Sequence, residues 1–97
     1  MRPSESLRRH RDEVRRVMAR YPVRNPKIFG SAARGEDSAA SDIDILVDLE
    51  EHASLDDIPR LERELEAILG CRVDIFTPTC LAPDVAARAQ ADLKPLP

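Results

Sequence analysis

The chain has 97 residues, of which 42% are hydrophobic, 34% are charged and 3% are aromatic, and it contains no Trp. A chain of this size forms one small globular domain, which we assign to residues 1–97, with little left for a second substrate-binding lobe. The shortage of aromatic side chains argues against a base-stacking platform, so direct nucleic-acid binding is not expected. No apolar run reaches membrane-spanning length or forms a signal peptide, and we therefore expect a cytoplasmic protein without a membrane partner.

The formal net charge of −3 is unevenly distributed along the chain. Residues 1–27 carry nine Lys and Arg against three Asp and Glu, whereas residues 28–97 carry six against fifteen. A basic N-terminal segment of this kind neutralises phosphates, docks on an acidic partner or forms a solvated helix face, and the sequence leaves these alternatives open. Cys71 and Cys80 do not have CxxC spacing, so we predict no zinc or redox site.

In the first half of the chain, helical spacing of apolar residues predicts a helix over residues 6–21, which Pro22 ends. The short apolar run at residues 27–29 predicts a brief strand that is entered from a turn. Residues 31–35 predict one helical turn, and a polar loop follows as far as Ser41.

The second half of the chain predicts a strand, a helix, a second strand and a weaker helix. Apolar and polar residues alternate over residues 42–49 and again over residues 71–76, which is the pattern of a strand. Between them, an apolar stripe predicts a helix that begins nearer Asp56 or Asp57 than Ser54, because of Pro59, and that Gly70 caps at its C-terminus. The last helix is predicted over residues 83–92. Because a crossover helix usually makes the two flanking strands parallel, we expect an α/β fold in which these strands are neighbours.

Three aspartates are the candidate chemical groups of this arrangement. Asp42 and Asp44 are two residues apart in one strand and therefore share a face, and Asp74 joins them if the two strands are neighbours. Carboxylates packed together repel one another unless a cation is present, and their oxygen ligands favour Mg²⁺ or Mn²⁺. Because Mg²⁺ is typically held by one or two carboxylates together with substrate phosphates, the pattern predicts a nucleoside triphosphate site.

A second group of residues is suited to the phosphates themselves. Gly30 allows close backbone approach, and Ser31 offers a hydroxyl at the start of a helical turn whose N–H groups are exposed. Arg34, one turn further on, either binds phosphate or acceptor with its guanidinium or forms a surface ion pair with Glu36 or Asp37. The sequence does not separate these two roles of Arg34.

The spacing of these residues resembles that of a known family. Gly30 and Ser31, ten further residues and then Asp42-Ile43-Asp44, within the string GSAARGEDSAASDIDILV, are similar to the signature of the polymerase-β-type nucleotidyltransferase superfamily. A chance match in a chain of this length is on the order of one in a thousand. The resemblance implies a polymerase-β-like core, with a small mixed sheet of three to four strands and helices packed on it. It also implies ATP as the donor, two Mg²⁺ ions held by Asp42 and Asp44, Ser31 as a triphosphate contact, and Asp74 as the third acid, either a metal ligand or a general base.

Because the chain lacks an acceptor-binding domain, the resemblance is closest to the MNT-type antitoxins. In that family the enzyme transfers AMP to a tyrosine of a partner, a HEPN-domain RNase toxin, and so inactivates it. Two other functions remain open on the sequence: a nucleotidyltransferase that acts on a small molecule such as an aminoglycoside, and a non-catalytic module that neutralises a partner by binding.

Overall fold

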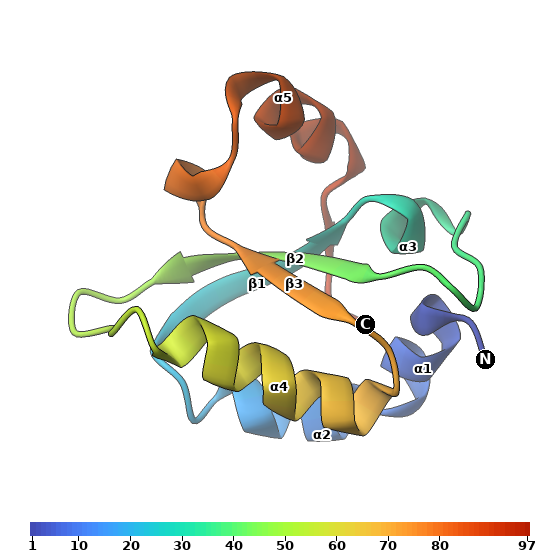
Figure 1. Ribbon diagram of the computed structural model, residues 1–97, viewed down its shortest axis with the longest axis horizontal. Coiled ribbons are helices and arrows are strands. Elements are labelled where there is room, and N and C mark those ends of the chain that lie inside the picture. Colours follow the sequence, from blue (N-terminus) through green and yellow to red (C-terminus); the bar gives the residue numbers. More distant parts are fainter.

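A mixed sheet with the strand order β3-β2-β1-β4 forms the centre of the computed structural model, which describes residues 1–97 (Figure 1). The strands are β1 (Val23–Phe29), β2 (Ile43–Leu49), β3 (Val73–Phe76) and β4 (Lys94–Pro95). The helices are α1 (Pro3–Arg9), α2 (Arg11–Met18), α3 (Ser31–Arg34), α4 (Asp57–Leu69) and α5 (Pro83–Asp92), with a short 3-10 turn, η1 (Pro78–Cys80). The predicted α/β class and the mixed sheet are therefore confirmed. None of the helices combines the length and the apolar character needed to cross a membrane.

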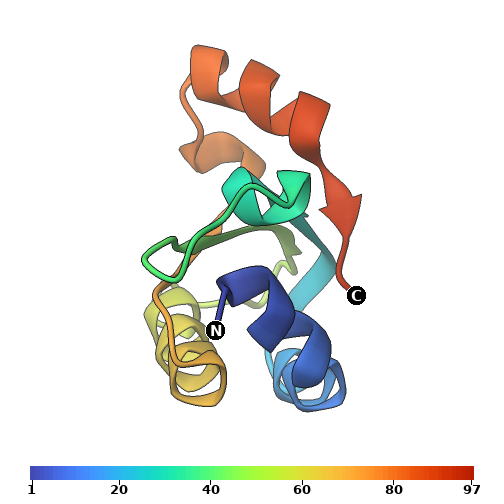
Figure 2. The same ribbon diagram turned by 90° about the vertical axis from the view of Figure 1, so that its right-hand side faces the viewer.

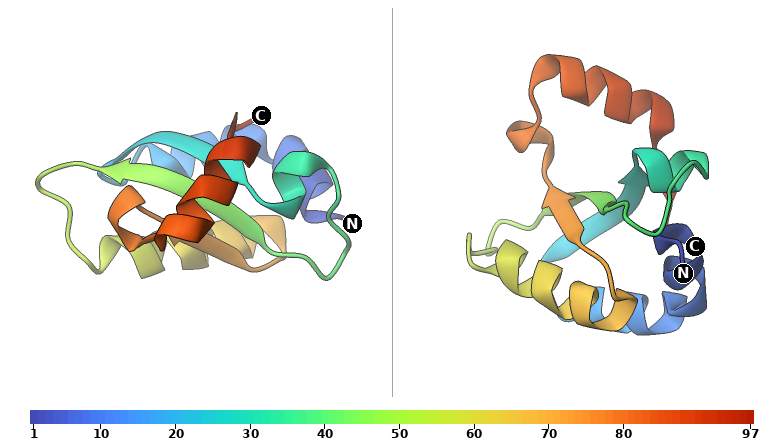
Figure 3. Two further views of the ribbon diagram at one scale, coloured as in Figure 1. Left: turned by 90° about the horizontal axis from the view of Figure 1, so that it is seen from above. Right: turned by 45° about the vertical axis from the view of Figure 1, so that its right-hand side comes forward.

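Helices α1, α2 and α4 cover one face of the sheet, while α3 and α5 lie on the other (Figures 1 and 2). The core lies between the sheet and the first group of helices, because the buried side chains alternate along the strands and repeat at helical spacing along α2 and α4. Its most deeply buried members are Leu7, Val14, Ile43, Ile45, Val47, Leu61, Leu65 and Val73. The residues between these along β2 and β3 consequently point to the opposite face, which α5 crosses (Figure 3).

The strand pairing brings the predicted carboxylates together. As predicted, β2 and β3 are parallel neighbours, and Asp44 lies opposite Asp74 in their register. Strand β1 pairs with the other side of β2 in antiparallel orientation and places Phe29, its last residue, opposite Asp44. The end of β1, the start of β2 and the start of β3 therefore meet at one edge of the open face.

The prediction of one continuous helix over residues 6–21 is wrong. It is divided at His10 into α1 and α2, and it begins earlier, at Pro3. The early start has a long-range cause: the buried carboxylate of Asp37 accepts hydrogen bonds from the Ser4 N–H at 2.7 Å and from the Ser4 hydroxyl at 2.9 Å. These bonds satisfy donors at the N-terminus of α1, as a capping side chain does.

The strand predicted over residues 27–29 is longer than expected. It extends back to Val23 through a bulge, where the pairing register with β2 shifts between Arg24 and Lys27. Pro26 lies in this bulge, and Asn25 there adopts a φ of 53°. Pro is tolerated in a strand at such an irregularity because the ladder hydrogen bond it cannot donate is already missing. Strand β4, formed by the Pro-containing tail, was not predicted.

The second half of the chain follows the prediction closely. Helix α4 spans Asp57–Leu69, and Gly70 caps it in the left-handed conformation with a φ of 72°. Helix α5 has the predicted bounds. The predicted strand over residues 71–76 forms only from Val73 onward.

Candidate active site

The three predicted aspartates converge on the open face of the sheet. Asp44 and Asp74 are partners in the β2–β3 register, and Asp42 directly precedes β2. Burial raises the pKa of the Asp44 carboxyl above its ordinary value, and the nearby charges of Asp74 and Asp42 raise it further. The folded protein thus disfavours the ionised form of Asp44 as long as no cation offsets the three charges.

Gly30 lies directly against the Asp44 carboxylate. The residue has a φ of 77° and a ψ of −158°, a combination essentially restricted to glycine. A Cβ atom built at residue 30 would lie 2.7 Å from Asp44 Oδ2, a distance shorter than van der Waals contact. Gly30 therefore both permits the sharp exit from β1 and keeps the space beside the carboxylate free of a side chain.

Ser31 is the first residue of α3, which follows this turn. No side chain caps α3, so the N–H groups of its first turn have no side-chain partner. The main-chain oxygen of Ser31 accepts a hydrogen bond from the Glu36 N–H at 2.9 Å, which closes the loop after the helix. Ser31 is half-buried and directly follows Gly30, the residue that lies against the Asp44 carboxylate.

Arg34 forms ion pairs in this structure. Its guanidinium donates hydrogen bonds to Glu36 at 3.2 Å and to Asp92, the last residue of α5, at 2.6 Å. Of the two ion-pair partners considered from the sequence, Glu36 is confirmed and Asp37 is wrong, because Asp37 is buried against Ser4 instead. The pair with Asp92 joins the end of α5 to the α3 turn.

Two features of the site were missed by the sequence analysis. Arg72 donates a hydrogen bond to Asp74 at 3.3 Å and so offsets one negative charge of the cluster. Phe29 and Phe76 pack with ring centroids 5.5 Å apart and an interplanar angle of 54°, from the two strands that flank β2. The sequence shows that Phe29 directly precedes Gly30 and that Phe76 follows Asp74 by two positions. It does not show that the two rings are in contact, because that depends on the order of the strands in the sheet.

The oxygen donors of this site suit a hard cation such as Mg²⁺. No group of three or more His, Cys, Asp or Glu side chains is arranged so that it could hold a metal ion by itself. Such a group is not required, because Mg²⁺ is commonly held by one or two carboxylates and completed by substrate phosphates. The crowded charges around Asp44 and the side-chain-free space beside its Oδ2 fit such a partly open site.

Residues 7–92 match the nucleotidyltransferase domain family. The chain belongs to this family. Protein adenylyltransferase MntA of Thermococcus cleftensis is 45% identical over 80 residues, which cover 82% of this chain and 78% of that protein. The family match thus spans the whole region of this nucleotidyltransferase that contains the glycine turn and the aspartates.

The solved structures agree with this assignment. A structure described as a minimal nucleotidyltransferase has a TM-score of 0.82 and 41% sequence identity, and the match covers 96% of this chain and 95% of that one. A structure of a toxin-antitoxin with AMP-PNP has a TM-score of 0.73 and covers 88% of this chain and 70% of that chain. At 20% identity the second likeness shows a common fold. The resemblance to minimal nucleotidyltransferases is confirmed.

Proposed function

We propose that this nucleotidyltransferase moves AMP from ATP to a tyrosine hydroxyl of a partner HEPN-domain toxin, with Mg²⁺ as the cofactor, and so acts as an antitoxin. The observation that carries the proposal is the meeting of Asp42, Asp44 and Asp74 beside the Gly30 turn. The relative from T. cleftensis is named a protein adenylyltransferase, and a similar fold occurs in a toxin-antitoxin with AMP-PNP. Both support a protein acceptor and an adenine nucleotide.

In the proposed reaction the tyrosine oxygen forms a bond to the α-phosphorus of ATP. The bond from that phosphorus to the bridging oxygen of the β-phosphate breaks, and pyrophosphate leaves with the electron pair. Asp42 and Asp44 would hold Mg²⁺, which supplies positive charge to the triphosphate and to the attacking oxygen. Asp74 would accept the tyrosine proton, or it would complete that ligand set while the proton passes to water.

The residues of the glycine turn would orient the triphosphate. Gly30 lets the nucleotide approach the backbone, and the Ser31 hydroxyl and the uncapped N–H groups of α3 donate hydrogen bonds to phosphate oxygens. For Arg34 to contribute a bidentate contact to phosphate, it must exchange one of its two present carboxylate partners.

The aspartate site is open to the surface, which suits an acceptor tyrosine that a second protein supplies. None of the hollows on the surface is lined by the three aspartates or by Gly30. Beside the bound ATP, a small acceptor would find no enclosing walls of its own, whereas a protein acceptor is held by the contact of the two protein surfaces. This observation favours a protein acceptor over an aminoglycoside.

The proposal is tested with the purified chain, ATP labelled at the α-phosphate, Mg²⁺ and the product of the neighbouring gene as the candidate HEPN-domain partner. Transfer of label to one tyrosine of that protein, lost when the tyrosine is replaced by phenylalanine and when EDTA is added, is the expected result. A tight complex of the two proteins that forms without any transfer of label would show neutralisation by binding alone and would contradict the proposal.

A further inference from the structure

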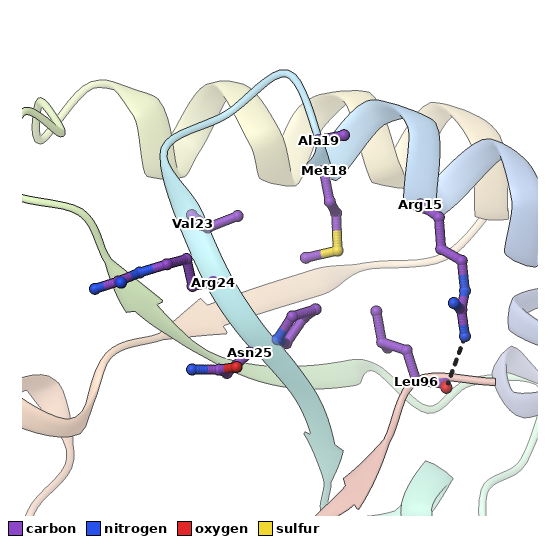
Figure 4. A pocket seen from close by; sticks show the side chains of 8 residues that line it. Arg15, Met18, Ala19, Val23, Arg24, Asn25 and Leu96 are labelled. Atoms are coloured by element: carbon purple, nitrogen blue, oxygen red, sulfur yellow. Dashed lines mark hydrogen bonds between the residues drawn. The ribbon is translucent and has the colours of Figure 1, made fainter.

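A hollow of about 360 Å³ lies far from the aspartates, between the end of α2, the start of β1 and the C-terminal residues (Figure 4). Five apolar residues line it: Met18, Ala19, Val23, Pro26 and Leu96. Arg15 from α2 and Arg24 from β1 also line it, with the Arg24 side chain extending from β1 to the side away from Met18 and Leu96 (Figure 4). Its size falls at the lower end of the range in which proteins bind ligands or partner side chains.

The hollow lies at the end of the basic N-terminal segment, residues 1–27, to which the proposed function assigns no role. Within residues 1–27, five exposed arginines take part in no ion pair: Arg8, Arg9, Arg11, Arg16 and Arg24. Arg15 donates hydrogen bonds only to main-chain oxygens, at 2.9 Å to Pro97 and at 3.5 Å to Leu96. The segment therefore retains much uncompensated positive charge, which would attract an acidic partner.

The adjoining edge of the sheet is unsuited to the addition of a further strand. Strand β4 covers β1 only at Lys27 and Ile28. Beyond it, Asn25 has a positive φ, Pro26 lacks an N–H group, and the register shifts at the bulge. Such irregularities keep an exposed edge from pairing with another chain. A partner at this position must be recognised through side chains.

We propose that this hollow docks an acidic segment of a partner protein, which inserts one apolar side chain between Met18 and Leu96 and places carboxylates near Arg15 and Arg24. A protein suits this hollow better than a nucleic acid does, because a phosphate backbone binds to positive charge but has no apolar group to bury in the hollow. Arginine and methionine around a small apolar pocket are typical of the energetic centre of a protein interface.

The docking site is separate from the chemistry. The residues of β1 that line the hollow, Val23 to Pro26, lie three to six positions before Phe29, the last residue of the strand, so at about 3.3 Å per residue they are about 10–20 Å from the aspartate edge. Docking at the hollow needs neither nucleotide nor metal and leaves the aspartate site accessible. The inference therefore goes beyond the proposed function and stands or fails independently of it.

The test measures the fluorescence anisotropy of a labelled 12-residue peptide of Asp and Glu with one central Leu. A second peptide with Ser in place of that Leu, and a labelled 12-base-pair RNA duplex, are the comparison probes. We expect the leucine peptide to bind at least about tenfold more tightly than the serine peptide, since burial of one Leu side chain contributes about 1.5–3 kcal/mol.

The variants locate the binding. Ala19 also lines the hollow, so Ala19→Phe, which fills it, and Arg24→Glu should each weaken binding of the leucine peptide at least tenfold. Arg63→Glu in α4, an equal change of charge at an exposed arginine without an ion pair, should leave it unchanged, and circular dichroism verifies that all variants fold. Asp44→Asn should bind the peptide like the wild type.

Three results would overturn the docking site: no binding of the leucine peptide, equal binding of the two peptides, or binding of the RNA duplex alone. An equal loss in Arg63→Glu and Arg24→Glu would likewise overturn it, because it would show attraction by net charge only. Failure of AMP transfer in the separate assay with the HEPN-domain protein would contradict the proposed function and leave this peptide binding intact.

Discussion

Gly30 and Asp44 are in such close contact that a single methyl group at residue 30 would lie 2.7 Å from the Asp44 Oδ2 atom. The contact joins the two halves of the candidate site, the glycine turn that would bind phosphate and the carboxylates that would bind Mg²⁺. It also explains why the turn needs glycine for two separate reasons, its backbone conformation and the space beside the carboxylate.

Gly30→Ala should therefore lose AMP transfer and also cost about 1–3 kcal/mol of stability. Gly35→Ala is the matched control. Gly35 also has a positive φ, of 72°, but a Cβ atom there would meet nothing within 4 Å. The Gly35→Ala variant should lose about 1–2 kcal/mol of stability and retain AMP transfer. Chemical denaturation and the AMP-transfer assay measure the two quantities, and equal losses of activity in the two variants would contradict a specific role of the contact with Asp44.

Asp37 should stabilise the fold in a pH-dependent manner. Burial raises the pKa of this carboxyl, but the hydrogen bonds from Ser4 and the charge of Arg2 lower it by more, so that the net pKa is below the ordinary value. A lowered pKa in the folded state stabilises the protein above the unfolded pKa of about 3.9, and the stabilisation is lost as the pH falls through the folded value.

We accordingly expect Asp37→Asn to lower the free energy of unfolding by about 1–3 kcal/mol at pH 7. The difference between the variant and the wild type should shrink as the pH is lowered below about 4. Urea denaturation at several pH values measures it. A difference that is independent of pH would show that the charge of Asp37 does not hold α1.

Arg34 and Asp92 allow a phosphate contact to be separated from an ion pair. Arg34→Gln removes the pair and the guanidinium, whereas Asp92→Asn removes the pair alone. If Arg34 binds phosphate, Arg34→Gln should raise the KM for ATP roughly ten- to a hundredfold, because a charge-assisted hydrogen bond contributes about 1.5–3 kcal/mol. Asp92→Asn should leave the KM within about twofold, since an exposed ion pair contributes about 0–1 kcal/mol. Equal effects of both variants on KM would assign Arg34 a purely structural role.

The crowding of carboxylates should reduce the stability of the metal-free protein. Since the fold raises the pKa of Asp44, its ionised form opposes folding at neutral pH. Asp44→Asn should therefore raise the Tm in EDTA by several degrees, as about 1 kcal/mol corresponds to about 4–8 °C for a domain of this size. The gain should vanish at acidic pH, where the wild-type carboxyl is protonated. Differential scanning calorimetry measures both values, and a lower Tm of the variant at pH 7 would contradict the electrostatic argument.

The sequence predicted those parts of the fold that depend on short repeating patterns. The alternation of apolar and polar residues predicted β2, and an apolar stripe followed by Gly70 predicted α4. The crossover rule correctly predicted that β2 and β3 are parallel neighbours, the pairing in which Asp44 lies opposite Asp74. The glycine turn and the order of residues in the candidate site followed from local spacing in the same way.

Features that depend on contacts between distant residues were not predicted. The start of α1 depends on a carboxylate 33 residues further along the chain, and Arg34 finds its partner Asp92 at a separation of 58 residues. Nothing local at Pro95 indicates that it pairs with β1. In each case the deciding interaction forms only once the sheet has assembled, and tertiary contacts of this kind override local propensity.

The most direct test of the account compares AMP transfer to the HEPN-domain protein by Asp44→Asn and Asp48→Asn. Both residues lie on the same face of β2, but only Asp44 stands beside Asp74 and Gly30, whereas Asp48 accepts a hydrogen bond from Asn25. We expect Asp44→Asn to lower the rate by at least about a hundredfold, since even the indirect supports of a metal site contribute 10–100-fold. Asp48→Asn should remain near the wild-type rate. A substantial rate in Asp44→Asn would contradict the central claim that the aspartates at the glycine turn form the catalytic site.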